Sequence, residues 1–141
     1  MRVFGMGLAV AVCVVTVGTG LALPGGEETP SAQAARKKLK QKISIDEKEI
    51  GFKAMLDAIK GEMDKPVSFK IDNISGISNN SKVTFAAKDK TVEEVLNALA
   101  DKYEFGWYVV SNAKDRNDGF VMVRKFKDKE RGYESGKEPK K

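Results

Sequence analysis

A repeat with a period of 40 residues restricts the fold of this chain more than any other feature of its sequence. Two segments, 52–63 and 92–103, carry apolar residues at the spacing of one helix face. The matching residues are Phe52, Met55, Leu56, Ile59 and Met63 in the first segment, and Val92, Val95, Leu96, Leu99 and Tyr103 in the second. Strand-like alternation flanks each segment, at residues 43–45 and 67–71 and again at 83–85 and 107–110. The sequence therefore predicts two β-α-β units that bury their helix faces against shared sheets.

Local signals mark the ends of these elements and add a last strand. Thr91 and Glu94 form the T-x-x-E pattern of a capping box, so the second helix is expected to begin there. The turn-rich segment 111–119 precedes an apolar strand at 120–124, which predicts a hairpin with a long loop. The predicted fold class is α+β, with the order β-α-β-β-α-β-β and two helices packed between small mixed sheets.

The N-terminal segment has the pattern of a targeting signal. Arg2 precedes an uncharged apolar stretch, Val3–Leu23, and small residues at Gly20 and Ala22 suit a cleavage site after Ala22. Residues 1–22 are therefore predicted to be a signal peptide, and the rest of the chain to be exported to the periplasm or secreted. The alternative is that the stretch stays uncleaved as a membrane anchor, because about 20 apolar residues can span a bilayer. In either case the membrane is contacted only through this stretch.

Composition argues against an enzyme. The chain has no His and a single Cys, Cys13, inside the predicted signal peptide. Hydrolases of the Ser-His or Cys-His type and His-ligated zinc sites are therefore excluded. Val12 precedes Cys13 where a lipidation signal needs a small residue. Lys125 stands six residues after Gly119, where a calcium loop containing that glycine needs its glutamate. We expect no catalytic residue, no metal and no cofactor.

Charge separates a folded middle from two basic flanks. Residues 23–42 carry five basic and two acidic side chains, and residues 124–141 carry eight basic and four acidic ones. The flank 23–42 is predicted to be a basic linker and residues 126–141 a charged, disordered tail, on either side of a domain at 43–125. Nucleic acid is not the expected partner, because the chain is exported and its basic residues are not interleaved with aromatic ones.

An aromatic and apolar group near the C-terminal end of the domain is the candidate interaction site. Its members are Trp107, Tyr108, Phe120 and Met122. The strand Phe120–Val123 is expected to lie at a sheet edge, where a partner strand could pair with its backbone. The alternative is a small-ligand site formed by the aromatic cluster Phe105–Tyr108, although core packing explains the same residues.

The domain resembles the short N-terminal domain of secretins and TonB-dependent receptors. The resemblance covers about residues 43–124 and rests on hydrophobic patterning and the capping box, without catalytic signatures. The residues that carry it are Ile43-Ser44-Ile45-Asp46, Phe52, Met55-Leu56, Lys82-Val83-Thr84-Phe85, Thr91-Val92-Glu93-Glu94-Val95-Leu96, Phe105-Gly106-Trp107-Tyr108 and Gly119-Phe120-Val121-Met122-Val123.

This resemblance implies a function as well as a fold. In that family the domain is a periplasmic protein-interaction module without a cofactor, which docks secretins to inner-envelope partners or signals to an anti-sigma regulator. No secretin pore, receptor plug or barrel follows residue 124 here, so secretion and transport do not carry over. The expected function is that of an exported, non-catalytic module that binds an envelope protein.

Overall fold

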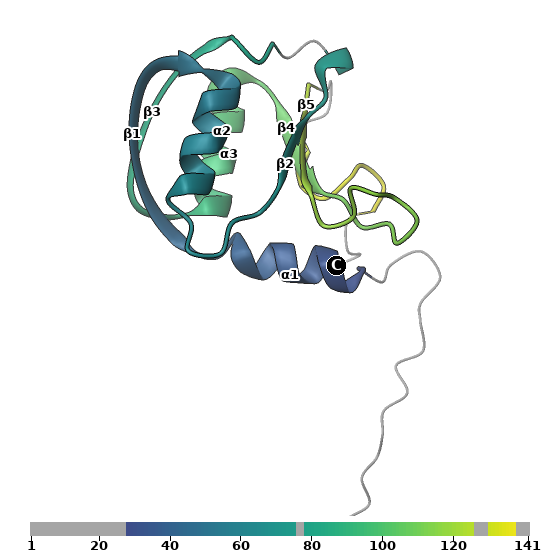
Figure 1. Ribbon diagram of the computed structural model, residues 1–141. Coiled ribbons are helices and arrows are strands. Elements are labelled where there is room, and N and C mark those ends of the chain that lie inside the picture. The colour runs from purple at the N-terminus through teal and green to yellow at the C-terminus, as the bar shows by residue number, and fades with distance from the viewer. Residues whose placement is uncertain (1–27, 76–77, 126–129, 138–141) are drawn as a thin grey trace, which may run out of the picture.

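The computed structural model describes residues 28–75, 78–125 and 130–137, and shows three helices and two small sheets (Figure 1). The predicted signal peptide, residues 1–22, lies outside the described residues. The elements are α1 (Pro30–Lys38), β1 (Lys42–Gly51), α2 (Phe52–Gly61), β2 (Phe69–Ile71), the 3-10 turn η1 (Asn73–Ser75), β3 (Lys82–Thr91), α3 (Val92–Tyr103), β4 (Gly106–Val109), β5 (Val121–Arg124) and β6 (Arg131–Gly132). From β1 to β5 their order is β-α-β-β-α-β-β, which confirms the predicted α+β fold.

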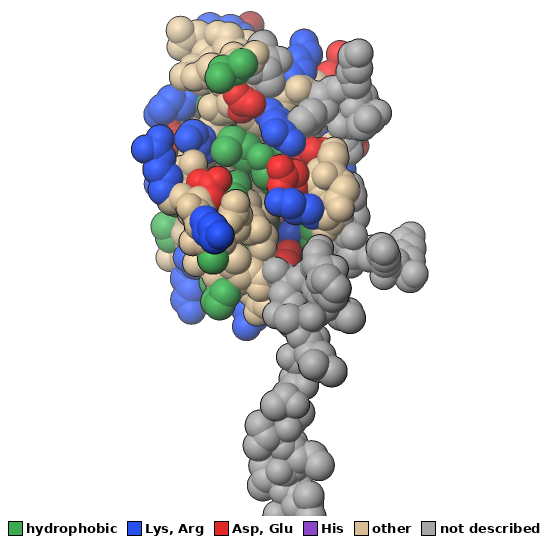
Figure 2. All heavy atoms as spheres, turned by 90° about the vertical axis from the view of Figure 1, so that its right-hand side faces the viewer, with side chains coloured by type: hydrophobic (Ala, Val, Ile, Leu, Met, Phe, Trp, Pro, Cys, Tyr) green, Lys and Arg blue, Asp and Glu red, His purple; other side chains and the backbone are tan. Residues whose placement is uncertain are grey.

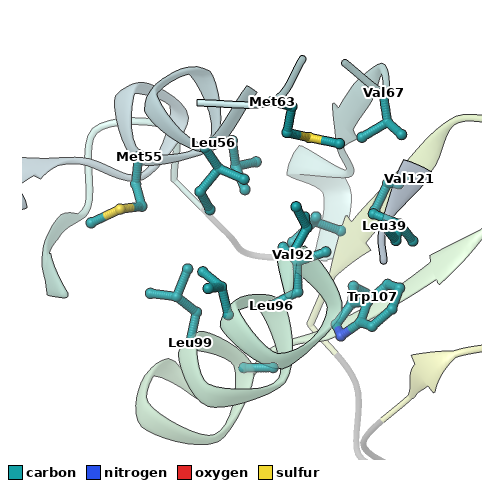
Figure 3. Packing of buried hydrophobic residues seen from close by; sticks show 14 of the residues in the cluster. Leu39, Met55, Leu56, Met63, Val67, Val92, Leu96, Leu99, Trp107 and Val121 are labelled. Atoms are coloured by element: carbon teal, nitrogen blue, oxygen red, sulfur yellow. The ribbon is translucent and has the colours of Figure 1, made fainter. Parts of the chain in front are cut away.

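The two long helices lie between the two sheets. β1 and β3 form a curved antiparallel pair on one side of α2 and α3, and a four-stranded mixed sheet of order β2-β5-β4-β6 lies on the other (Figure 1). The helix faces identified from the sequence are buried, with Tyr103 partly so. Figure 3 shows Met55 and Leu56 of α2 together with Leu96 and Leu99 of α3 in this core. The repeat thus buries its apolar positions in one shared core.

The 40-residue repeat appears in the structure as an approximate two-fold relation between β1 and β3. Glu49 has a left-handed backbone, with φ of 50°, and its N–H donates to Thr84 Oγ1 at 2.9 Å. Asp89, 40 residues later, has φ of 53° and donates to Ser44 Oγ at 3.1 Å. These irregular positions let both strands continue for ten residues, well beyond the short alternating stretches that the sequence marks.

The capping box predicted for the second helix is present. Thr91 Oγ1 accepts from the Glu94 N–H at 3.2 Å, and the Glu94 carboxylate accepts from the Thr91 N–H at 2.8 Å. These hydrogen bonds from Thr91 hold the pKa of Glu94 below its usual value. The box satisfies two backbone donors that the first helical turn leaves without an intrahelical partner.

Thr91→Ala is expected to lower the free energy of unfolding by about 1 kcal/mol, because the Glu94 N–H loses its acceptor. Chemical denaturation monitored by circular dichroism measures this change. Thr84→Ala is a useful comparison, since Thr84 Oγ1 also accepts a backbone N–H but lies in a strand. A Thr91→Ala variant as stable as the wild type would show that the box does not stabilise α3.

The predicted basic linker is wrong for residues 30–38, which form α1. Thr29 caps this helix, with its Oγ1 accepting from the Ala32 N–H at 3.2 Å. Ala32, Ala35 and the following Leu39 are buried in the core. Their 3-4 spacing is helical, but two alanines give a weak hydrophobic signal beside several lysines. The basic flank is therefore partly an integral helix of the domain.

The predicted disordered tail is wrong for residues 130–137. This segment, which we call the C-terminal strap, contributes β6 to the four-stranded sheet by parallel pairing with β4. Its polar composition hides this role, because the strand is two residues long and most of its contacts are polar. The remaining residues of the tail, 126–129 and 138–141, lie outside the described residues.

Candidate interaction surface

The strand expected at a sheet edge is in fact central. β5, which contains Met122, pairs with β2 on one side and with β4 on the other. Phe120 precedes it, and the Phe120 carbonyl accepts from the Val110 N–H at 2.9 Å. The prediction of an exposed edge at Phe120–Val123 is therefore wrong. β2 pairs with β5 although about 50 residues separate them, a long-range contact that hydrophobic patterning does not reveal.

The aromatic residues of the candidate site are packed into the structure. Trp107 is 1% exposed, and its Nε1 donates to Asn97 Oδ1 at 2.9 Å. Phe105 is buried against Phe52 in an edge-to-face pair with 5.1 Å between ring centroids. A shallow cavity of about 580 Å³ on the β1–β3 sheet contains none of these rings. The cluster thus acts as core, and the observation that motivated a small-ligand site is lost.

Tyr108 lies on the opposite face of β4 from Trp107 and is 6% exposed. The guanidinium of Arg124 lies 4.7 Å from the centre of its ring, a cation–π arrangement. Burial raises the pKa of the Tyr108 hydroxyl above its usual value. Tyr108 is therefore also unavailable to a partner.

A buried carboxylate holds the C-terminal strap against the sheet. Glu130 is 4% exposed, and its Oε1 accepts from Arg124 Nη2 at 3.1 Å, from the Ser135 N–H at 2.8 Å and from Ser135 Oγ at 2.7 Å. Further along the strap, the Tyr133 ring stacks under the guanidinium of Arg36 at 3.8 Å, which ties the strap to α1.

The strap fills the outer edge of β4. The Trp107 N–H donates to the Glu130 carbonyl at 3.2 Å. Arg131 then reaches the end of α3, where it pairs with Asp101 at 2.6 Å and donates to the Phe105 carbonyl at 3.0 Å. One end of the four-stranded sheet is thus closed by the chain itself.

In the part of the chain that the structure describes, the other end of the sheet is open. The Ser68 carbonyl accepts from the Val121 N–H at 2.8 Å, and the Asp72 N–H donates to the Val123 carbonyl at 2.8 Å. Because backbone groups alternate in direction along a strand, the N–H and C=O groups of Phe69 and Ile71 point away from β5. Among the described residues no strand pairs with these groups, which we call the β2 edge.

The surroundings of the β2 edge combine apolar and charged groups. Ile74, just after the strand, is 99% exposed, which is unusual for a large apolar side chain beside an open strand. Figure 2, which looks onto the side of the molecule formed by the four-stranded sheet, shows hydrophobic side chains among charged ones of both signs. Such a mixture is ordinary for a protein surface, so the exposed Ile74 is the more informative feature beside the β2 edge.

Other kinds of site have little support in the described part of the chain. There, no three acidic, His or Cys side chains lie close enough together to hold a metal ion. No described helix has the length and apolar character needed to cross a bilayer. Comparison of the chain with models of protein families, with curated proteins and with solved structures found no match.

Proposed function

We propose that this protein is an exported, non-catalytic interaction module of the bacterial cell envelope, which binds another envelope protein by adding a strand to the β2 edge. Export is supported by Arg2 and the apolar stretch that follows it. The envelope role is supported by the resemblance to the short N-terminal domain of secretins and TonB-dependent receptors.

One observation carries the proposal: within residues 28–75, 78–125 and 130–137, one edge of the four-stranded sheet is closed by β6 and the other has no strand paired to it. Proteins usually protect such edges, because unpaired backbone groups recruit other strands. A partner strand would gain about 0.5–1.5 kcal/mol for each backbone hydrogen bond that it makes. The exposed Ile74 offers an additional apolar contact next to the strand.

Ile71→Pro is expected to abolish partner binding, because proline removes an outward N–H from the β2 edge without touching the hydrogen bonds to β5. Ile71→Ala is the matched control, since it loses the same side chain but keeps the N–H. Binding is measured in cells with a photo-crosslinking residue at Ser68, which is exposed beside the strand.

The expected result is a crosslinked partner with the wild type and with Ile71→Ala, and none with Ile71→Pro. A crosslinking residue at Glu93, on the exposed side of α3, provides a background measurement. Crosslinks that are equally strong in the proline variant, or that form only from position 93, would contradict binding at the β2 edge.

A further inference from the structure

We infer that the β2 edge selects a partner strand in which a carboxylate lies between two apolar residues. This inference rests on the proposed function and specifies the chemistry of the partner. It follows from the three residues of β2, from the charges that surround them, and from the way the chain itself closes the equivalent edge of β4.

Lys70 is the middle residue of β2 and has no ion pair or side-chain hydrogen bond among the described residues. It lies beside Met122 of β5 in the sheet register, so its neighbour on that side is uncharged. The nearby Asp72 carboxylate accepts from the Ile74 N–H at 3.0 Å. An added strand would place one side chain directly opposite Lys70, and a carboxylate there would be the favourable cross-strand partner.

The residues on either side of Lys70 set the rest of the pattern. Phe69 and Ile71 are partly buried and pack against the hydrophobic core, so they lie on the inner face of the sheet. Side chains alternate between faces along a strand. The residues before and after the partner's carboxylate would therefore extend the inner face, next to Phe69 and Ile71, and apolar residues fit that place.

A second copy of the chain does not match this edge. The antiparallel register that pairs all of β2 with itself places Lys70 opposite the Lys70 of the other copy, and like charges in that position repel. The strap of a second copy, added as it is on β4, would place Arg131 on the inner face, next to Phe69 or Ile71. On β4, Arg131 is held by Asp101 of α3. The residue of α2 that corresponds to Asp101 in the repeat is Gly61, which has no carboxylate to hold an arginine. The occupant is therefore a different protein.

The filled edge of β4 shows that this architecture accepts an added strand. β4 and β2 occupy equivalent places in the 40-residue repeat, and both direct their even-numbered residues to β5 and their odd-numbered residues outward. On β4, a side chain of the added strand is chosen by charge, since Arg131 pairs with Asp101. On β2 the charged residue is Lys70, which lies on the outer face beside Met122, so there the selection by charge would act on the outer face.

The test is a charge swap with two synthetic peptides, Thr-Val-Ser-Val-Asp-Val-Ser-Val-Thr and its analogue with Lys in place of Asp. Each is titrated into the full chain at low salt, and binding is followed through the backbone amide signals of Phe69 and Ile71 in NMR spectra. Opposite and like cross-strand charges differ enough that the Asp peptide should bind roughly threefold to tenfold more tightly. In Lys70→Glu the preference should reverse, while Lys88→Glu, on the β1–β3 sheet, should keep it.

The outcomes separate this inference from the proposed function. Peptides that bind equally well whatever their charge, and that lose binding in Ile71→Pro, would overturn the inference and leave strand addition intact. Failure of both peptides to bind the wild type would overturn the inference, and the crosslinking from Ser68 would then decide the proposed function alone. A dimer of the wild type in light scattering that Lys70→Glu alters would assign the edge to a second copy instead.

Discussion

Trp107→Ala is expected to lower the free energy of unfolding by about 3–5 kcal/mol, the range found when a large aromatic side chain is removed from a core. The indole is almost completely buried and donates to Asn97 Oδ1, so truncation creates a cavity and leaves a partly buried acceptor without its donor. Small domains are stable by about 5–15 kcal/mol, so this one substitution could leave much of the population unfolded.

Thermal and denaturant unfolding followed by circular dichroism measures this loss. Trp107→Phe keeps most of the ring volume and should cost clearly less than alanine, because it loses the hydrogen bond but creates a smaller cavity. Ile74→Ala is the surface control and should change stability by less than about 0.5 kcal/mol. A Trp107→Ala variant as stable as the Ile74→Ala variant would show that the ring is not part of the core.

The repeat made the central fold predictable. Helical periodicity placed both long helices correctly, since five apolar positions in each had to face a sheet. The Thr91–Glu94 pair marked the start of α3 to the residue. These signals are local and depend on backbone geometry that the sequence determines within one or two turns.

Features that depend on distant parts of the chain were not predictable in this way. The continuation of β1 through charged residues such as Asp46 and Lys48 depends on its pairing with β3. The insertion of β5 between β2 and β4 changed an expected edge strand into a central one. β5 is apolar on both faces, which suits an edge strand as well as a central one. The alternation of apolar and polar residues indicates which faces of a strand are buried, but not which strands pair with it.

The candidate interaction surface in the structure differs from the predicted one for the same reason. Trp107 and Tyr108 are candidate contacts in the sequence because they are aromatic, but both are buried, Trp107 in the core and Tyr108 beneath the Arg124 guanidinium. The β2 edge carries a weaker sequence signal, a three-residue alternation around Lys70. This alternation becomes informative only once the sheet order is known, because only then is β2 seen to be an edge strand.

Glu130→Ala is expected to release the C-terminal strap and to cost about 2–3 kcal/mol. The carboxylate accepts three hydrogen bonds through Oε1, and its removal leaves Arg124 and Ser135 without their shared acceptor. We expect a value below the 3–5 kcal/mol typical of a fully buried ion pair, since Arg124 keeps partial contact with solvent. Burial of Oε2 without a hydrogen bond reduces the net contribution of the carboxylate further.

Hydrogen exchange of two backbone amides, one in β4 and one just after it, distinguishes local release of the strap from destabilisation of the whole domain. The Trp107 N–H is bonded to the Glu130 carbonyl and should exchange faster in Glu130→Ala, whereas the Val110 N–H is bonded to the Phe120 carbonyl and should change little. Glu134→Ala is the matched control, because that glutamate lies in the same strap but its carboxylate pairs with the exposed Lys137. Equal acceleration at both amides would mean that Glu130 stabilises the whole domain, and no acceleration at Trp107 would mean that β6 stays in place without its carboxylate.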